Sequence, residues 1–464
     1  GVPQKEGISV RFQTWLRDNS TLPGVSFLAK AYEYCLMELS ADSDGLVEEW
    51  AGGIVGHEYP TPPRILQYTE TICRRYLDWA ICAGNQPADT TFDLFAVEGS
   101  TAGMCYCFDV LKRNFLLDKG DSIAIMVPVF TPYLEIPELK EFDYTMLNVK
   151  ADGITPDGMH TWQYNPDDIM KLKNPRYKML FVTNPSNPPS YAIDSQTVEA
   201  LKEVVKANPD LMILTDDVYG TFVDGYRSLI AELPFNAMSC YSFSKYFGAT
   251  GWRIALTAVS RDNIFDRLIS RLPADKKAAL AKRYQSLTID IDSLKFIDRM
   301  VAESRLIALN HTAGLSTPQQ IQMSLFALGA LIDSDGTYHT RMIKLIHDRY
   351  EALWKSFGFQ MPADPLRADY YSEIDMMVWA RRLHGEEFAR YMEKTYSPLA
   401  FVFRLASETG CVVLNGDGFD GPAWSIRVSL ANLNEADYVR LGTNIRQILN
   451  QFAEDWEASK TTTN

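Results

Sequence analysis

The chain has 464 residues, of which 46% are apolar and 12% aromatic, and this is enough to fill the interior of a large globular protein. Its 45 basic and 59 acidic side chains give a formal net charge of −14, without a dense run of lysine and arginine. This balance argues against nucleic acid or a membrane surface as a partner. Seven scattered cysteines favour reduced thiols in a cytoplasmic protein, and no apolar run is long enough to span a bilayer.

The length predicts two domains. Residues 1–55 lack strand-like runs and are expected to form a helical part that packs with the smaller domain. Residues 56–341 are expected to form the large domain, and residues 342–464 a small C-terminal domain of mixed α+β structure. A charged, amphipathic stretch at about 272–305 is expected to be a helical insertion in the large domain.

Short apolar runs alternate with amphipathic stretches in the first half of the large domain. The runs lie at residues 93–97, 122–127, 178–182, 211–215, 237–243 and 254–259. Continuous apolar strands of this length are typical of a parallel sheet that is covered on both faces. The pattern therefore predicts an α/β fold with a mainly parallel, doubly wound sheet.

Ligands of open parallel sheets bind beyond the carboxyl ends of the strands, so the residues that follow each run are candidates for a site. Gly99, Ser100 and Thr101 follow the first run and open a helix, where backbone amides and hydroxyls suit a phosphate. Phe130 follows the second run between two prolines and could stack on a flat ring. When each is taken alone, the first feature is better explained as a helix cap and the second as a core aromatic under a loop.

Polar side chains also follow the next two runs. Asn187 lies in a proline-rich turn after the third run and could donate a hydrogen bond to a phenolate oxygen. Asp216 ends the fourth run, and a carboxylate there could keep a pyridine nitrogen protonated. Tyr219 would share the phenolate oxygen with Asn187. An ordinary turn and a solvated acidic loop are the alternatives.

Lys245 follows the fifth run, within the segment SFSKYFGATGWR. A lysine amine can bond covalently to pyridoxal phosphate, and Ser242, Ser244 and Arg253 are spaced to meet the phosphate of the same cofactor. Each strand end taken singly is weak evidence for a cofactor site. Five consecutive strand ends together supply groups for the phosphate, one face of the ring, the phenolate oxygen, the ring nitrogen and the covalent link. They therefore predict one pyridoxal 5'-phosphate pocket with Lys245 as its catalytic residue.

These motifs resemble the fold-type I pyridoxal phosphate enzymes of the aspartate aminotransferase superfamily over nearly the whole chain. In the segment SIRVSLANL, Arg427 matches the arginine that binds the substrate α-carboxylate, where a planar bidentate group is needed, and Asn187 is expected beside the substrate as well. Tyr59, in GHEYPTPPR, matches the tyrosine that reaches the cofactor phosphate of a second subunit. The resemblance therefore implies a homodimer with shared active sites.

Within the superfamily, FAVEGSTA, VTNPSNPPS, LTDDVYGTF and YSFSKYFGATGWR are similar to the aspartate 4-decarboxylases. This resemblance implies conversion of L-aspartate into L-alanine and carbon dioxide, a side aspartate aminotransferase activity, and a larger homo-oligomer, a dodecamer. The family also has an N-terminal Gly-Arg-Gly-Asn-Pro run near the substrate, which we expect to precede Gly1.

One difference from the aminotransferases supports the decarboxylase interpretation. Aspartate aminotransferases hold the side-chain carboxylate of the substrate with an arginine shortly before a Ser-x-Pro turn. Here the turn at Ser316 is preceded by residues 311–314, HTAG, and no arginine stands at that place. A strong bidentate cation would stabilise the ground state of a carboxylate that has to leave.

Two other functions stay open. A plain class I aminotransferase acting on an acidic amino acid would share the fold and the cofactor. A non-catalytic regulator or scaffold with the same fold is disfavoured because the set of cofactor residues is complete. No metal is expected, since Cys105 and Cys107 lack a second ligand pair.

Overall fold

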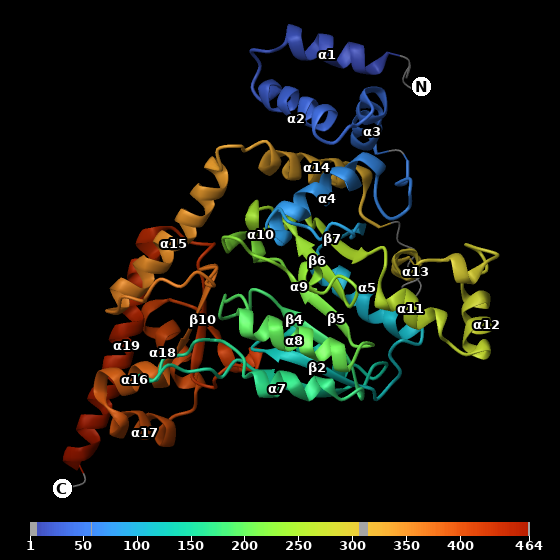
Figure 1. Ribbon diagram of the computed structural model, residues 1–464. Coiled ribbons are helices and arrows are strands. Elements are labelled where there is room, and N and C mark those ends of the chain that lie inside the picture. Colours follow the sequence, from blue (N-terminus) through green and yellow to red (C-terminus); the bar gives the residue numbers. More distant parts are fainter. Residues whose placement is uncertain (1–6, 57, 306–313, 463–464) are drawn as a thin grey trace. The chain divides into compact units, whose positions relative to one another are not determined.

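The computed structural model describes residues 7–56, 58–305 and 314–462 (Figure 1). The chain divides into two compact units. The first unit comprises Gly1–Asp121, Pro209–Thr221 and Gly225–Thr340, and the second comprises Ser122–Asn208, Phe222–Asp224 and Arg341–Asn464.

A seven-stranded sheet has the strand order β1-β7-β6-β5-β4-β2-β3. Its strands are β1 Phe92–Val97, β2 Ser122–Val127, β3 Thr145–Lys150, β4 Tyr177–Thr183, β5 Met212–Asp216, β6 Ala237–Ser242 and β7 Ala255–Ser260. The pairs β5–β6, β2–β4 and β2–β3 are parallel, while β7 is antiparallel to both β1 and β6. The predicted α/β class is confirmed, and each predicted run coincides with a strand to within a residue or two.

The strand β3 was not predicted. Its sequence, TMLNVK, mixes polar with apolar residues, and only Val149 is buried. It is the last strand in the order, so on one side it has no neighbouring strand among the described residues. An edge position does not require the continuous apolar sequence of a central strand, which is why the search for apolar runs missed it.

In the first unit, one long helix packs on several strands. The helix α5 (Ser100–Arg113) contacts β1, β6 and β7, and α9 (Leu229–Glu232) contacts β5 and β6. Lys112 and Arg113 lie in the last turn of α5, where positive charge is favourable at the negative end of a helix dipole. Further helices of this unit are α4 Gln67–Cys82, α10 Phe243–Tyr246, α11 Ile264–Ser270, α12 Ala274–Arg283 and α13 Phe296–Ser304. The stretch expected as a helical insertion thus contains α12 and α13.

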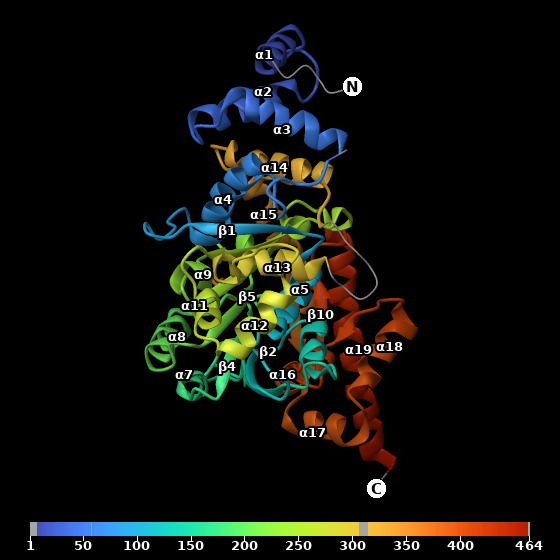
Figure 2. The ribbon, with the colours of Figure 1, turned by 90° about the vertical axis from the view of Figure 1, so that its right-hand side faces the viewer.

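The N-terminal residues are helical, as expected. They form α1 (Ile8–Asp18), α2 (Val25–Met37) and α3 (Ser43–Val55), and α2 and α3 pack against α14 (Thr317–Leu331) of the same unit (Figures 1 and 2). Two of these helices begin at capping side chains that accept backbone hydrogen bonds, Asp42 for α3 and Ser316 for α14. Their assignment to the small domain stays a prediction.

The second unit contains β2, β3 and β4 with their helices, and a three-stranded antiparallel sheet in the order β8-β10-β9. Its strands are β8 Tyr371–Asp375, β9 Leu414–Asn415 and β10 Ser425–Ser429. The helices are α6 Pro132–Glu135, α7 Pro166–Met170, α8 Ser195–Ala207, α15 Thr337–Phe357, which begins in the first unit, α16 Met376–His384, α17 Glu386–Thr395, α18 Leu399–Thr409 and α19 Glu435–Thr462. Figure 2 shows α17 and α18 beside the long helix α19, which both contact.

None of the helices in the described part of the chain combines the length and apolar character that crossing a membrane requires.

Candidate active site

The register of four strands in the first unit brings the candidate segments of this unit to one edge of the sheet. Val97 at the end of β1 pairs with Ala255 at the start of β7, and Ala255 pairs with Ser242 at the end of β6. Asp216 at the end of β5 pairs with Cys240, two residues before the end of β6. Because β7 runs antiparallel to its neighbours, its first residue lies level with their last residues. The turn at Gly99, the lysine segment and Arg253 therefore start from the same edge.

Gly99 and Arg253 are in close contact. Gly99 precedes α5 with φ 97° and ψ 156°, and within the part of the chain that the structure describes no side chain caps this helix end. A Cβ added at Gly99 would lie 2.1 Å from Nη2 of Arg253. Only glycine therefore lets the guanidinium approach the first turn of α5, where backbone amides point outward. A guanidinium beside a helix N-terminus is an arrangement that suits an anion such as phosphate.

Arg253 itself is exposed and lies in the left-handed region with φ 54°. Its Nη1 donates to the carbonyl oxygen of Thr250 at 3.0 Å. Of the hydroxyl residues that start α5, Ser100 is half-buried and Thr101 is exposed. The structure therefore places Gly99, Ser100, Thr101 and Arg253 around one helix end, as a phosphate site would require.

Lys245 is half-buried on the short helix α10, directly after β6. Ser242 caps this helix, since its Oγ accepts a hydrogen bond from the backbone N–H of Ser244 at 3.1 Å. Ser242 Oγ also lies 3.4 Å from the carbonyl oxygen of Ile254. Ser244 Oγ is buried and has no hydrogen-bond partner among the described residues. A buried hydroxyl of this kind usually has a partner, so its donor is left to pair with a ligand.

Two adjacent carboxylates lie at the end of β5, which is the fourth of the predicted runs. Asp216 is buried, and its Oδ1 accepts a hydrogen bond from the backbone N–H of Val218 at 3.2 Å. Tyr219, which follows shortly after Asp216 in the chain, is buried as well. A buried carboxylate at this edge is the group that a protonated ring nitrogen would need.

The neighbouring carboxylate, Asp217, was not singled out from the sequence. It is fully buried and accepts hydrogen bonds from four hydroxyl groups, those of Thr215, Ser228, Ser239 and Tyr226. Burial raises the pKa of the Asp217 carboxyl, while these four hydrogen bonds oppose the rise. The network ties the end of β5 to β6 and to the segment after the turn, so it fixes the backbone that carries Asp216. The only sequence signal was a second acidic residue directly after a buried strand.

In the second unit, Arg427 lies on β10 with its guanidinium group against two aromatic rings. Its guanidinium carbon lies 4.6 Å from the ring centre of Tyr371 and 4.7 Å from that of Phe419. Nη1 donates to Oδ1 of Asn187 at 3.2 Å, and Nε is buried without a hydrogen-bond partner among the described residues. The aromatic rings hold the guanidinium in place, and its remaining donors suit a carboxylate.

Backbone contacts within the second unit place Asn187 beside Arg427. The segment after β4 returns against β8: the backbone N–H of Ala368 donates to Ser190 O at 2.7 Å, and that of Tyr371 to Ser190 Oγ at 2.8 Å. The segment after β2 is held similarly, since the Val129 N–H donates to Phe419 O at 2.9 Å.

Phe130, which follows Val129, is half-buried and makes an edge contact with the ring of Tyr133 at 5.5 Å. Tyr59, the residue predicted to serve a second subunit, has 77% of its surface exposed. The residues before the Ser316 turn, His311, Thr312 and Ala313, lie outside the described residues.

The residues present fit pyridoxal phosphate in three respects. The Gly99–Arg253 contact and the open end of α5 fit its phosphate, the buried Asp216 carboxylate fits its ring nitrogen, and the unpartnered Ser244 hydroxyl offers a further hydrogen bond. Among the described residues, no cluster of three or more His, Cys, Asp or Glu side chains could hold a metal ion.

Comparisons with known proteins identify the family of the chain. A bifunctional aspartate aminotransferase and L-aspartate beta-decarboxylase of a Pseudomonas species is 44% identical over 459 residues, which cover 99% of this chain and 85% of that protein. An aspartate/prephenate aminotransferase of Nitrosomonas europaea is 27% identical over 30% of this chain and 34% of its own. These relatives confirm the resemblance inferred from the strand-end motifs.

Solved structures show the same fold. An aspartate aminotransferase from Thermus thermophilus with maleate has a TM-score of 0.61 at 17% identity, covering 93% of this chain and 98% of that one. An aromatic aminotransferase from Pyrococcus horikoshii has a TM-score of 0.59 at 18% identity, covering 88% of this chain and 91% of that one. The family model of aminotransferase class I and II matches residues 100–445. The chain therefore belongs to the aminotransferase class I and II family.

Proposed function

We propose that this protein removes the β-carboxylate of L-aspartate to give L-alanine and carbon dioxide, with aspartate aminotransferase activity as a side reaction. The observation that carries the proposal is the 44% identity, along 99% of the chain, with an enzyme named for both activities. Membership of the aminotransferase class I and II family supports the shared chemistry of the two reactions.

The proposed cofactor is pyridoxal 5'-phosphate, which when bound draws electron density out of the bonds at the substrate α-carbon. Lys245 would bond it, and Asp216 would keep its ring nitrogen protonated. The residues proposed to hold the phosphate are Gly99, Ser100, Thr101, Ser242, Ser244 and Arg253, with Tyr59 from a second subunit. Asn187 and Tyr219 would bind the phenolate oxygen, and Phe130 would lie against the ring.

Two residues of this chain would carry the substrate chemistry. Arg427 would bind the α-carboxylate with the donors that the Asn187 hydrogen bond leaves available, and so would orient the α-carbon. The Nζ atom of Lys245 would remove the α-proton and hold it for return. The β-carboxylate leaves more readily if no strong cation holds it in the ground state.

We infer further that the protein acts as a homodimer with shared active sites, that dimers assemble into a dodecamer, and that it works in the cytoplasm. The exposure of Tyr59 is compatible with a role toward a second subunit. The division into an N-terminal helical part, a large cofactor domain and a small C-terminal domain is part of the same proposal.

Incubation of the holoenzyme with L-aspartate and no keto acid tests the proposal. Alanine and carbon dioxide should form in equal amounts and in many-fold excess over enzyme. If no carbon dioxide is released, but a parallel incubation to which 2-oxoglutarate is added forms glutamate, the protein is a plain aminotransferase. If neither reaction occurs, the protein is a non-catalytic member of the family.

A further inference from the structure

Glu373 is a buried carboxyl group in the second unit with one unsatisfied oxygen. It lies on β8 with 5% of its surface exposed. Oε1 accepts a hydrogen bond from Ser425 Oγ at 2.7 Å, whereas Oε2 is buried without a hydrogen-bond partner among the described residues. An ionised carboxylate normally has both oxygens satisfied, so this arrangement favours the neutral acid.

Two close backbone approaches enclose Glu373. A Cβ added at Gly421 would lie 2.4 Å from Oε1, and one added at Gly416 would lie 2.8 Å from it. Glycine at these two positions lets the backbone close over the carboxyl group and exclude solvent. The pKa of Glu373 is raised to about 8, mainly by burial; the hydrogen bond from Ser425 and the charge of Arg427 oppose the rise, and the nearby Asp375 adds to it.

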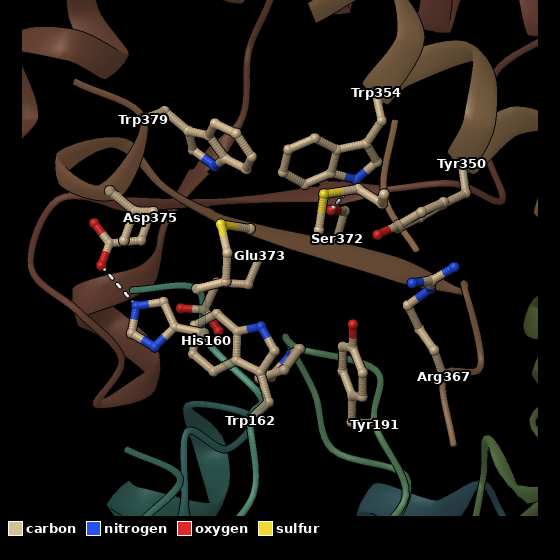
Figure 3. A pocket seen from close by; sticks show the side chains of 14 residues that line it. His160, Trp162, Tyr191, Tyr350, Trp354, Arg367, Ser372, Glu373, Asp375 and Trp379 are labelled. Carbon is tan, nitrogen blue, oxygen red and sulfur yellow. Dashed lines mark hydrogen bonds and ion pairs between the residues drawn. The ribbon is translucent and has the colours of Figure 1, made fainter. Parts of the chain in front are cut away.

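A small cavity of about 30 Å³ adjoins Glu373 (Figure 3). This volume holds roughly one water molecule. His160 lines the cavity, stacks on Trp162 at 4.3 Å and contacts Asp375 through Nε2 at 2.8 Å. Its Nδ1 is buried without a hydrogen-bond partner among the described residues. The other titratable or charged lining residues are Tyr191, Tyr350 and Arg367.

The strand register relates Glu373 to Arg427. The two residues are direct partners in the antiparallel pair β8–β10, so their side chains leave the same face of the sheet. Asp375 faces the same side two residues further along β8. Two acidic residues belong to the segment around Gly416 and Gly421: Asp417 is exposed, and Asp420 accepts a hydrogen bond from Asn148 at 2.6 Å.

We propose that Glu373 is a positioning residue that stays neutral beside Arg427, so that the guanidinium keeps its charge for the substrate carboxylate, and that ionisation of Glu373 weakens carboxylate binding. This inference rests on the proposed role of Arg427. An ionised Glu373 would place a second carboxylate on the same cation, where it would compete with the ligand. By linkage, a bound carboxylate holds the proton on Glu373 more tightly.

Binding of succinate to the holoenzyme tests the proposal, because succinate has two carboxylates and no amine. Titration calorimetry should show Kd rising about tenfold between roughly pH 6.5 and 9, which corresponds to one unit of ligand-induced pKa change. In Glu373→Gln and Glu373→Met the part of this rise due to Glu373 should disappear. The control Glu387→Gln removes an exposed charge of the same unit and should keep the wild-type profile.

Parallel profiles for wild type and Glu373→Gln would overturn the inference, since the rise would then come from another group. A separate outcome tests the premise: if Arg427→Lys leaves Kd for succinate unchanged, the proposed role of Arg427 fails, and the inference with it. If Arg427→Lys weakens binding but Glu373→Gln keeps the profile, only the inference fails.

Infrared spectroscopy of the native holoenzyme gives a readout that needs no variant. A carbonyl band of a protonated carboxyl group should vanish as the pH rises through about 8, and succinate should move that midpoint upward. A spectrum without a ligand-dependent carboxyl band would overturn the inference.

Discussion

Arg427 and Asn187 are joined by a hydrogen bond of 3.2 Å from Nη1 to Oδ1, although 240 residues separate them in the chain. A residue proposed to bind the cofactor thus also orients the residue proposed to bind the substrate. We therefore expect changes at either position to affect both ligands.

Arg427→Lys should raise KM for aspartate on the order of 100-fold, because lysine loses both the bidentate geometry and the donor to Asn187, a loss of about 2–3 kcal/mol. Steady-state kinetics of carbon dioxide release measure this effect. Arg440→Lys changes an exposed arginine of the same unit and should leave KM unaltered. An unchanged KM in Arg427→Lys would remove this arginine from the substrate site.

Gly99→Ala should weaken binding of pyridoxal phosphate at least about tenfold, because the new methyl group would displace Arg253 and strain the backbone by about 1–3 kcal/mol. Titration of the apoenzyme, followed by visible absorbance, measures the affinity. Gly120→Ala is the matched control: it also has positive φ, at 85°, but nothing lies within 4 Å of its added Cβ. Equal affinities in both variants would show that the contact with Arg253 is not used.

Lys245→Ala should abolish turnover and the visible absorbance of the covalently bound cofactor, because no other amine is proposed to form that bond. Absorbance spectra and the carbon dioxide assay test the two effects separately. Lys206→Ala, which removes an exposed lysine, should behave like the wild type. Retention of both properties in Lys245→Ala would contradict the proposed function.

Glu373 should make stability depend on pH. Its pKa is about 8 in the folded protein, against an ordinary value of 4.5, so the folded state binds the proton more tightly than the unfolded chain. Its contribution is therefore most favourable below about pH 4.5 and is lost as the pH rises toward 8, by up to about 5 kcal/mol. Melting curves of wild type and Glu373→Gln should converge at low pH, and the variant should be relatively more stable at alkaline pH. A constant difference in Tm at all pH values would contradict this linkage.

Asp217→Asn should lower the free energy of unfolding by about 2–4 kcal/mol, because an amide nitrogen would face hydroxyl groups that now donate to a carboxylate. Denaturant titration measures the loss. Because Asp217 fixes the backbone of Asp216, cofactor affinity should fall as well. The exposed Asp262→Asn in the same unit should change neither quantity by more than about 0.5 kcal/mol. A variant as stable as the wild type would mean that the four hydroxyls find other partners.

The apolar runs predicted the strand positions well, because buried central strands need continuous apolar sequence. The run at 122–127, for example, coincides with β2. Strand direction was not predictable in the same way: β7 is as apolar as its neighbours but runs antiparallel to both. Direction depends on how the connection folds back, which the polarity of a strand does not encode.

Candidate site residues were predictable where a strand end carried an unusual side chain, as at Asp216 and Lys245. Their contacts were not, since the approach of Gly99 to Arg253 depends on strand register. Glu373 was missed for a different reason. In the sequence YSEID it has the polarity of a solvent-exposed strand residue, and its burial comes from Gly416 and Gly421, more than forty positions away.

The reversed direction of β7 has a consequence for how this site tolerates change. Because β6 ends and β7 begins at the same edge, the connection 243–254 carries both Lys245 and Arg253 on a single loop with both ends anchored. Inserting or deleting one residue there would shift Lys245 relative to Arg253, and so the proposed covalent anchor of the cofactor relative to the proposed ionic one. The length of this loop is thus under stricter control than its composition, and homologues or engineered variants should differ there by substitution and not by insertion.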